Sequence, residues 1–116
     1  MNYPQIILLN GASSSGKTTL ALELRKLLPL PYFYYSSDQL VDADFLPNVD
    51  RNVKDTIYSW NIIRPNFFSG FHNSIAAFAK AQNLLLVEHI IEYQEWLDEL
   101  VVLLEPYKVF YIGVFC

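Results

Sequence analysis

A short stretch of glycine and serine residues is the clearest chemical signal in the chain. Residues 11–18 read GASSSGKT and match the pattern G-x-x-x-x-G-K-[ST], in which backbone N–H groups surround the phosphates of a nucleotide. Glycine permits the left-handed turns that point these N–H groups at an anion. Lys17 would then reach the β- and γ-phosphates, and the Thr18 hydroxyl would ligate Mg²⁺. The stretch therefore predicts a P-loop that binds ATP and Mg²⁺.

We expect the whole loop and the first turn of the following helix to contact the nucleotide. This predicted site contains nine residues: Gly11, Ala12, Ser13, Ser14, Ser15, Gly16, Lys17, Thr18 and Thr19. Lys17 is also expected to act in catalysis because it would contact the phosphoryl group that is transferred. The alternative is a serine-rich turn in front of a helix. The context favours the phosphate site, since the motif follows an apolar run and opens an amphipathic segment.

The segments around the loop alternate between apolar strands and amphipathic helices. The run Ile6–Leu9 is typical of a strand that is buried on both faces, and leucines at helical spacing follow the loop as far as Pro29. Further strands are predicted at residues 31–37, 83–89 and 107–116, and helices within 36–47, 67–82 and 93–105. Residues 47–66 show no sustained period, and we expect an irregular excursion there. Apolar strands that alternate with helices predict an α/β domain with a parallel sheet.

Composition and charge exclude several classes of protein. The chain has 116 residues, the typical length of one domain; 53% of them are hydrophobic, and the net charge is −4. No basic face for nucleic acid is apparent, and no apolar run approaches the roughly 20 residues that a membrane-spanning helix needs. The one cysteine, Cys116, and the absence of a signal-peptide pattern at the N-terminus favour the cytoplasm.

Three stretches of the sequence resemble the chloramphenicol phosphotransferase-like family of small-molecule kinases. They are NGASSSGKTTLALELRKLLPLPYFYYSSDQL, RPNFFSGFHNSIAAFAKAQNLLLVEHII and VFYIGVFC, in the family's order. The resemblance implies a three-layer P-loop kinase-like fold, with strand order 2-3-1-4 and helices on both faces of the sheet. It also implies transfer of the γ-phosphoryl group of ATP to a hydroxyl of a small molecule, without choosing the acceptor.

The resemblance also assigns roles to two carboxylates at strand ends. The family's general base is an aspartate just after the second strand, which is Asp38 here. Ligands bind at this edge of open α/β sheets, and a carboxylate there can accept the hydroxyl proton. Alternatively, Asp38 or Ser37 caps the helix that follows. Glu88 ends the third strand, where such kinases place an acidic residue toward Mg²⁺. The family more often has two aspartates there, whereas this chain has Glu88 and His89, and His89 has no nearby partner for a metal site.

Several other side chains are candidates for an acceptor pocket. His72, Arg64 and the aromatic residues of the middle region could line it, and Trp60 could belong to a lid. Each is weighed against a role in the core, because an aromatic stripe at helical spacing usually packs inside the protein.

Members of the resembled family continue beyond the fourth strand with a helical lid that contains arginines. No arginine follows Arg64 here, so we expect one nucleotide-binding domain over residues 1–116 that is incomplete at its C-terminus. Its last strand would lie exposed at a sheet edge, where strands of other chains can pair. Three functions remain open: a small-molecule kinase, a nucleotide-binding remnant with little catalysis, and an assembly partner that forms homo-oligomers through this edge.

Overall fold

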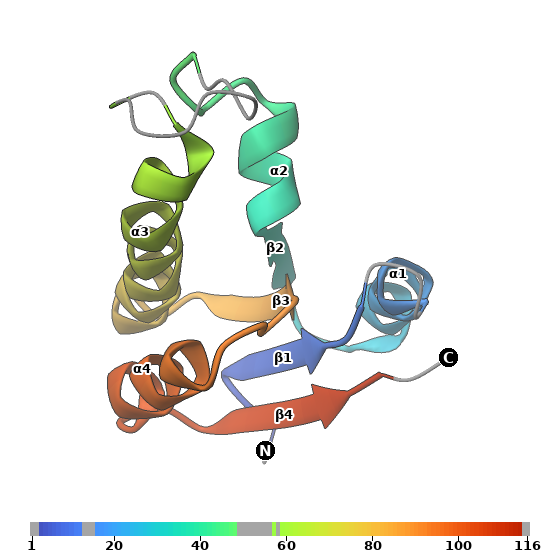
Figure 1. The fold of residues 1–116 in the computed structure, drawn as a ribbon. Coiled ribbons are helices and arrows are strands. Elements are labelled where there is room, and N and C mark those ends of the chain that lie inside the picture. The colour runs from blue at the N-terminus through green and yellow to red at the C-terminus, as the bar shows by residue number, and fades with distance from the viewer. Residues whose placement is uncertain (1–2, 13–15, 49–56, 58, 115–116) are drawn as a thin grey trace.

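The structure is a computed structural model that describes residues 3–12, 16–48, 57 and 59–114 (Figure 1). Strands and helices alternate along most of the chain, as the sequence predicts. The elements are β1 (Ile6–Asn10), α1 (Lys17–Leu27), β2 (Tyr32–Ser36), α2 (Ser37–Asp42), α3 (Trp60–Lys80), β3 (Leu84–His89), α4 (Gln94–Leu104) and β4 (Val109–Gly113).

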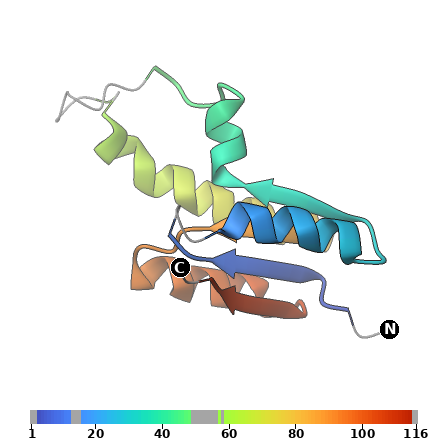
Figure 2. The same ribbon diagram turned by 90° about the vertical axis from the view of Figure 1, so that its right-hand side faces the viewer.

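The four strands form one parallel sheet in the order β2-β3-β1-β4, which confirms the predicted order 2-3-1-4. The register aligns the carboxyl ends of the inner strands: Glu88 pairs with Leu9 on one side and with Ser36 on the other. Figure 2 shows the arrowheads at one end of the sheet, the end at which α2 and the N-terminal half of α3 lie. Residues that follow β1, β2 and β3 therefore meet at a common edge.

Helices cover both faces of the sheet, which confirms the predicted three layers. On one face, α3 and α4 pack over alternate residues of β1 and β3, such as Leu8 and Val87. On the other face, α1 packs through Ala21 against Ile7 and Leu86. The inner strands β1 and β3 are apolar on both faces because both of their faces are buried, which is why their sequences show no alternation. No helix in the described part of the chain is both long enough and apolar enough to cross a membrane.

Helix α3 begins earlier than the sequence predicts. Residues 60–66 are helical, so the prediction of an irregular excursion is wrong for this part, although Pro65 lies inside the helix. Proline removes one backbone hydrogen bond and is normally unfavourable there. Packing compensates: the Trp60 ring lies 5.8 Å from the Phe67 ring and 6.4 Å from the Phe68 ring, centroid to centroid. Residues 49–56 and 58 of the predicted excursion lie outside the described residues.

Strand β4 forms one edge of the sheet, as the sequence suggested for the last strand. Within the described part of the chain it pairs with β1 alone, and its Phe110 and Tyr111 side chains are about half exposed. An apolar strand in this position offers unpaired backbone groups along its free side.

Candidate functional site

The predicted phosphate-binding loop connects the end of β1 to the start of α1. Gly16 has φ 89° and ψ 13°, a left-handed conformation that a larger side chain would strain. It is the N-cap of α1 and, as a glycine, offers no capping side chain to the backbone N–H groups of the first turn. Such a helix N-terminus attracts anions through its dipole and its free N–H groups. Ser13, Ser14 and Ser15 of the predicted site lie outside the described residues.

Lys17 is buried although it is charged. Its side chain is only 6% exposed, and its Nζ donates a hydrogen bond of 3.1 Å to the carbonyl oxygen of Ala12. The aliphatic part therefore packs against the protein while the ammonium group lies over the loop. A buried cation beside a helix N-terminus is suited to an anionic ligand that neutralises it.

The Glu88 side chain, at the end of β3, forms a hydrogen bond with the first turn of α1, next to the loop. Thr18 Oγ1 donates a 2.9 Å hydrogen bond to Glu88 Oε1, and the Tyr34 hydroxyl donates to Glu88 Oε2. The carboxylate is 8% exposed, and these two donors hold it in place. The two residues predicted to hold the metal, Thr18 and Glu88, are thus in direct contact.

Hydroxyl and carboxylate oxygens of this kind fit Mg²⁺. Among the described residues, no three His, Cys, Asp or Glu side chains are grouped as a metal site. Proteins usually bind Mg²⁺ through one or two oxygen ligands together with substrate phosphates and water. Thr18 and Glu88 would supply the protein's share.

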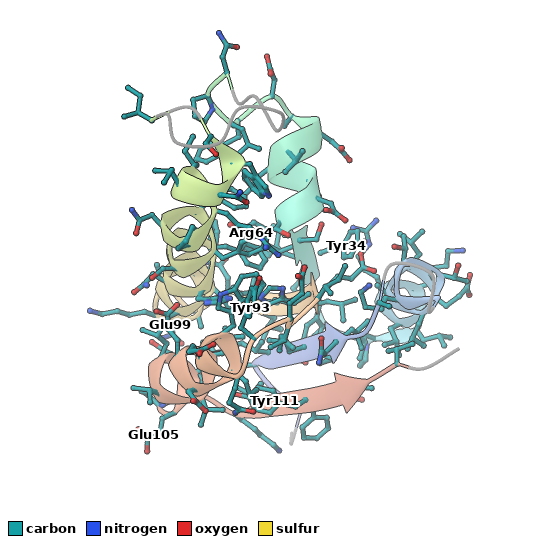
Figure 3. The ribbon with its side chains drawn as sticks, in the orientation of Figure 1. Tyr34, Arg64, Tyr93, Glu99, Glu105 and Tyr111 are labelled. Atoms are coloured by element: carbon teal, nitrogen blue, oxygen red, sulfur yellow. The ribbon has the colours of Figure 1, made fainter. Side chains whose placement is uncertain are left out.

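Sequence reasoning missed Tyr34, but a signal for it existed. Tyr34 lies two residues before Ser36, which pairs with Glu88, and alternate residues of a strand share a face. Tyr34 and Glu88 consequently project to the same side of the sheet, the side of α1. Figure 3 labels Tyr34 on that side.

A cavity of about 220 Å³ lies at the carboxyl edge of the sheet. Helices α1, α2 and α3 contribute to its wall, together with the end of β3 and the residues that follow it. It is lined by Lys17, Thr18, Ser36, Ser37, Asp38, Trp60, Arg64, Phe68, Glu88, His89, Ile90 and Glu92. The cavity therefore brings together Lys17, Asp38 and Glu88, which the sequence had singled out separately.

The Asp38 side chain is not the helix cap. Ser36 is the N-cap of α2, and it forms a reciprocal pair with Gln39: Gln39 N donates to Ser36 Oγ at 3.3 Å, and Ser36 N donates to Gln39 Oε1 at 3.0 Å. The predictions that Ser37 or Asp38 caps this helix are wrong, because the chain turns into the helix one residue earlier. Asp38 is exposed in the first turn and faces the cavity.

Arg64 reaches the cavity from α3 (Figure 3). Its Nη2 lies 2.7 Å from Glu92 Oε2, and its Nη1 donates a 3.2 Å hydrogen bond to the Tyr93 hydroxyl. The guanidinium also lies 5.4 Å from the centre of the Trp96 ring, within range of a cation–π contact. The hydrogen bond to Glu92 is the main cause that raises the pKa of Arg64, so this side chain is a fixed positive charge at the cavity wall.

His72 is not part of the cavity wall, contrary to one of the predictions. It is 0% exposed, because α3 packs this face against the sheet. Its Nε2 lies 2.8 Å from His89 Nε2, and its Nδ1 lies 2.7 Å from Glu99 Oε1 on α4. We call these three residues the Glu99–His72–His89 network.

Burial keeps both histidines of the network uncharged. Desolvation lowers the pKa of His72 despite the hydrogen bond to Glu99, which acts in the opposite direction. Desolvation also lowers the pKa of His89 to about 3, with smaller contributions from the neighbouring His72 and Lys17. No local sequence pattern predicts this network, since its members are 17 and 27 residues apart.

Comparison with known proteins agrees with this geometry. The family model of chloramphenicol phosphotransferase-like proteins matches residues 4–116. No curated protein matches the sequence.

Three of the solved structures with a similar fold are kinases. They include an unliganded sugar kinase from Janibacter sp. HTCC2649, with a TM-score of 0.61 and 18% identity over 97% of this chain. A gluconokinase from Sinorhizobium meliloti 1021 has a TM-score of 0.62 at 14% identity, again over 97% of this chain. A hexameric APS kinase from Thiobacillus denitrificans has a TM-score of 0.61 at 16% identity over 94%. The chain spans 60%, 58% and 22% of these three proteins, and the likeness concerns the fold alone.

Proposed function

Because the chain belongs to the chloramphenicol phosphotransferase-like family, we propose that it transfers the γ-phosphoryl group of ATP to a hydroxyl group of a small molecule. The observation that supports this best is the shared cavity of Lys17, Asp38 and Glu88. These residues come from three separate elements and match the three tasks of phosphoryl transfer: holding phosphate, accepting a proton and binding the metal.

The α1 side of the cavity would hold the nucleotide. Lys17 would exchange its bond to the Ala12 carbonyl for bonds to phosphate oxygens, which are stronger because both partners are charged. The N–H groups at the start of α1 would surround the same phosphates. Thr18 and Glu88 would hold Mg²⁺, which would offset the negative charge of the phosphates.

Asp38, in the first turn of α2, would act as general base in the same cavity. As the acceptor oxygen forms its bond to the γ-phosphorus, the bond from phosphorus to the ADP oxygen breaks, and the hydroxyl proton passes to the Asp38 carboxylate. The exposed position of Asp38 leaves room for an acceptor, and Trp60 and Phe68 supply an apolar wall to the same cavity.

Two other functions have a specific observation in their favour. Arg64, the arginine at the cavity, is already paired with Glu92, which favours a protein that binds nucleotide with little transfer. The half-exposed aromatic side chains of edge strand β4 favour assembly through this edge. Binding without turnover would support the first of these, and a stable dimer without nucleotide affinity would support the second.

Calorimetric titration with Mg-ATP tests the nucleotide site. We expect saturable binding by the wild type and an affinity loss of about 100-fold in Lys17→Ala, because hydrogen bonds to charged groups are worth roughly 1.5–3 kcal/mol each. Lys26→Ala is the matched control, since Lys26 lies exposed on the same helix and forms a surface ion pair with Glu23. No binding by folded wild type would remove the proposed function.

An acceptor panel of chloramphenicol and gluconate, assayed with labelled ATP, then tests transfer. The first compound is suggested by the family's description and the second by a structural neighbour. A phosphorylated alcohol that appears with the wild type and not with Lys17→Ala would support transfer at this site.

A further inference from the structure

Strand β2 forms the edge of the sheet opposite to β4 (Figure 1). It pairs with β3 on one side, and no strand in the described part of the chain pairs with its other side. Its sequence, YFYYS, contains no charged residue and no proline, which are features that proteins commonly use to protect a free edge. The Phe33 side chain is 61% exposed. The edge is therefore accessible to a further strand.

The backbone of β2 has hydrogen-bonding groups on this free side. Tyr32 N donates to the carbonyl oxygen of Leu30 at 2.9 Å. The exposed Gln39 side chain donates from Nε2 to the Tyr34 carbonyl at 3.2 Å and accepts from Ser36 N at 3.0 Å. These local bonds indicate that the even-numbered residues of the strand direct their backbone groups away from β3. The Tyr34 N–H then faces the free side together with its carbonyl, which has a second lone pair.

An apolar pocket of about 240 Å³, which we call the edge pocket, lies beside this strand. It is lined by Phe33, Tyr34, Tyr35, Phe78, Asn83 and Leu85. Tyr35 packs against the core under α3, and Phe33 shares its face because the two residues are two positions apart. The Phe78 ring, on α3, meets the Tyr35 ring edge-on at 5.5 Å and is 45% exposed. Exposed aromatic rings around a hollow are typical of the centre of protein interfaces.

The two ends of β2 lie beside groups of opposite charge. The last turns of α1 and α3 lie at its start and contain three basic residues: Arg25, Lys26 and Lys80. Residues 37–48, which follow its end, contain three acidic residues and no basic one: Asp38, Asp42 and Asp44. Figure 2 shows α1 ending at the end of the sheet opposite to α2. A second copy of this strand in antiparallel orientation would therefore bring acidic groups to basic groups at both ends, which favours association.

We propose that two copies of this chain associate through β2, with the two strands antiparallel and centred on Tyr34. Each Tyr34 N–H donates to the Tyr34 carbonyl of the partner subunit. Phe33 then lies opposite Tyr35 of the partner subunit, in the kind of pair whose side chains are closest. The Phe33 ring of each copy covers the edge pocket of the other.

The strand thus supplies both the ring and the pocket that the ring covers. A contact in which the same surface serves on both subunits closes with two-fold symmetry and produces a dimer. The sheets of the two copies become continuous across the interface. The inference concerns the edge opposite to β4 and does not depend on the proposed function.

Sedimentation equilibrium of the purified chain over a range of concentrations tests the proposal. We expect a reversible dimer with a dissociation constant of about 1–100 µM, in keeping with a small interface. Phe33→Lys should raise this constant roughly 100-fold, because each dimer loses two buried rings that are worth about tenfold each. Phe110→Lys is the matched control: it places the same charge at an aromatic residue of similar exposure on β4, and the dimer should persist.

A charge reversal at an exposed position tests the orientation of the two strands. In the antiparallel dimer Lys80 faces the acidic end of the partner subunit, so Lys80→Glu should weaken the dimer about three- to tenfold. Equal or tighter association of Lys80→Glu would overturn the antiparallel arrangement.

Two results would overturn the proposal as a whole. The first is a dimer that Phe110→Lys abolishes and Phe33→Lys preserves, because the contact would then lie at β4. The second is a wild type that is monomeric up to about 100 µM, beyond the range expected for this interface. The edge pocket would then be open to an extended segment of another protein.

Discussion

The two walls of the cavity differ in whether their charged side chains are paired with an opposite charge. On the α1 side, Lys17 and Glu88 are charged, largely buried, and bonded to neutral partners: a backbone carbonyl and two hydroxyl groups. On the α3 side, Arg64 is already paired with Glu92, and the buried histidines are neutral. Uncompensated buried charge is unfavourable unless a ligand of opposite charge binds. The first wall is thus suited to phosphate and Mg²⁺, and the second to a neutral molecule with apolar and hydrogen-bonding parts.

Acid should lower the free energy of unfolding mainly through the two buried histidines of the α3 wall. His72 and His89 are neutral in the folded protein, and His89 is packed near His72 and Lys17, with Glu99 behind His72. Below about pH 6.5 these histidines bind protons in the unfolded chain but not in the folded one, so the free energy of unfolding falls as the pH falls. For His89 the fall continues to about pH 3, where its ring is protonated in the folded protein as well. The loss is at most about 1.4 kcal/mol per pH unit for each proton.

Denaturant titrations between pH 7 and 4 measure this effect. The comparison with His89→Asn isolates it from the carboxylates, which titrate in both proteins. Equal pH dependence in the wild type and in His89→Asn would show that His89 is not a buried neutral group.

On the α1 wall, Glu88→Gln should weaken binding of Mg-ATP. The amide retains the size of the side chain and one acceptor oxygen, but loses the charge that a cation needs. We expect about a 10- to 100-fold loss, the range found when groups that support a metal are removed. The loss of affinity should appear when the protein is titrated with ATP in the presence of Mg²⁺. It should be small when ATP is added in the presence of EDTA.

Glu105→Gln, a change at an exposed glutamate just after α4, is the control. If Glu88→Gln bound Mg-ATP as tightly as this control, Glu88 would have no part in the metal site.

Arg64→Ala should have the smallest effect, and it should be on stability. The ion pair with Glu92 is partly exposed and is expected to contribute roughly 0.2–1 kcal/mol. The contact with the Trp96 ring adds about 0.5–1 kcal/mol. Chemical denaturation should therefore show a loss of about 1 kcal/mol with Mg-ATP affinity unchanged. If Arg64→Ala lost more binding free energy for Mg-ATP than free energy of unfolding, Arg64 would contact the phosphates. The α3 wall would then bind nucleotide as the α1 wall does.

Local patterns in the sequence were sufficient to predict a parallel sheet and the phosphate-binding loop, whereas the strand order and the roles of Asp38 and Glu88 followed from the resemblance to the family. Apolar runs identify strands buried on both faces, and a strand end next to a P-loop predicts where Asp38 and Glu88 lie. The α3 wall could not be predicted in this way. Helix α3 begins at Trp60 because aromatic packing outweighs the cost of Pro65 inside the helix. The Glu99–His72–His89 network joins residues that no spacing rule relates. Contacts between distant elements form only when the chain has folded.

Phosphoryl transfer by Asp38→Asn is the most direct test of the central claim, which is that one cavity joins a nucleotide site to a base for the acceptor. We predict that this variant binds Mg-ATP like the wild type and transfers phosphate to the acceptor about 10²- to 10⁴-fold more slowly, the range for loss of a general base. Asp42→Asn, a change at another exposed aspartate of α2, should transfer at the wild-type rate. Transfer by Asp38→Asn at the rate of Asp42→Asn would contradict the claim.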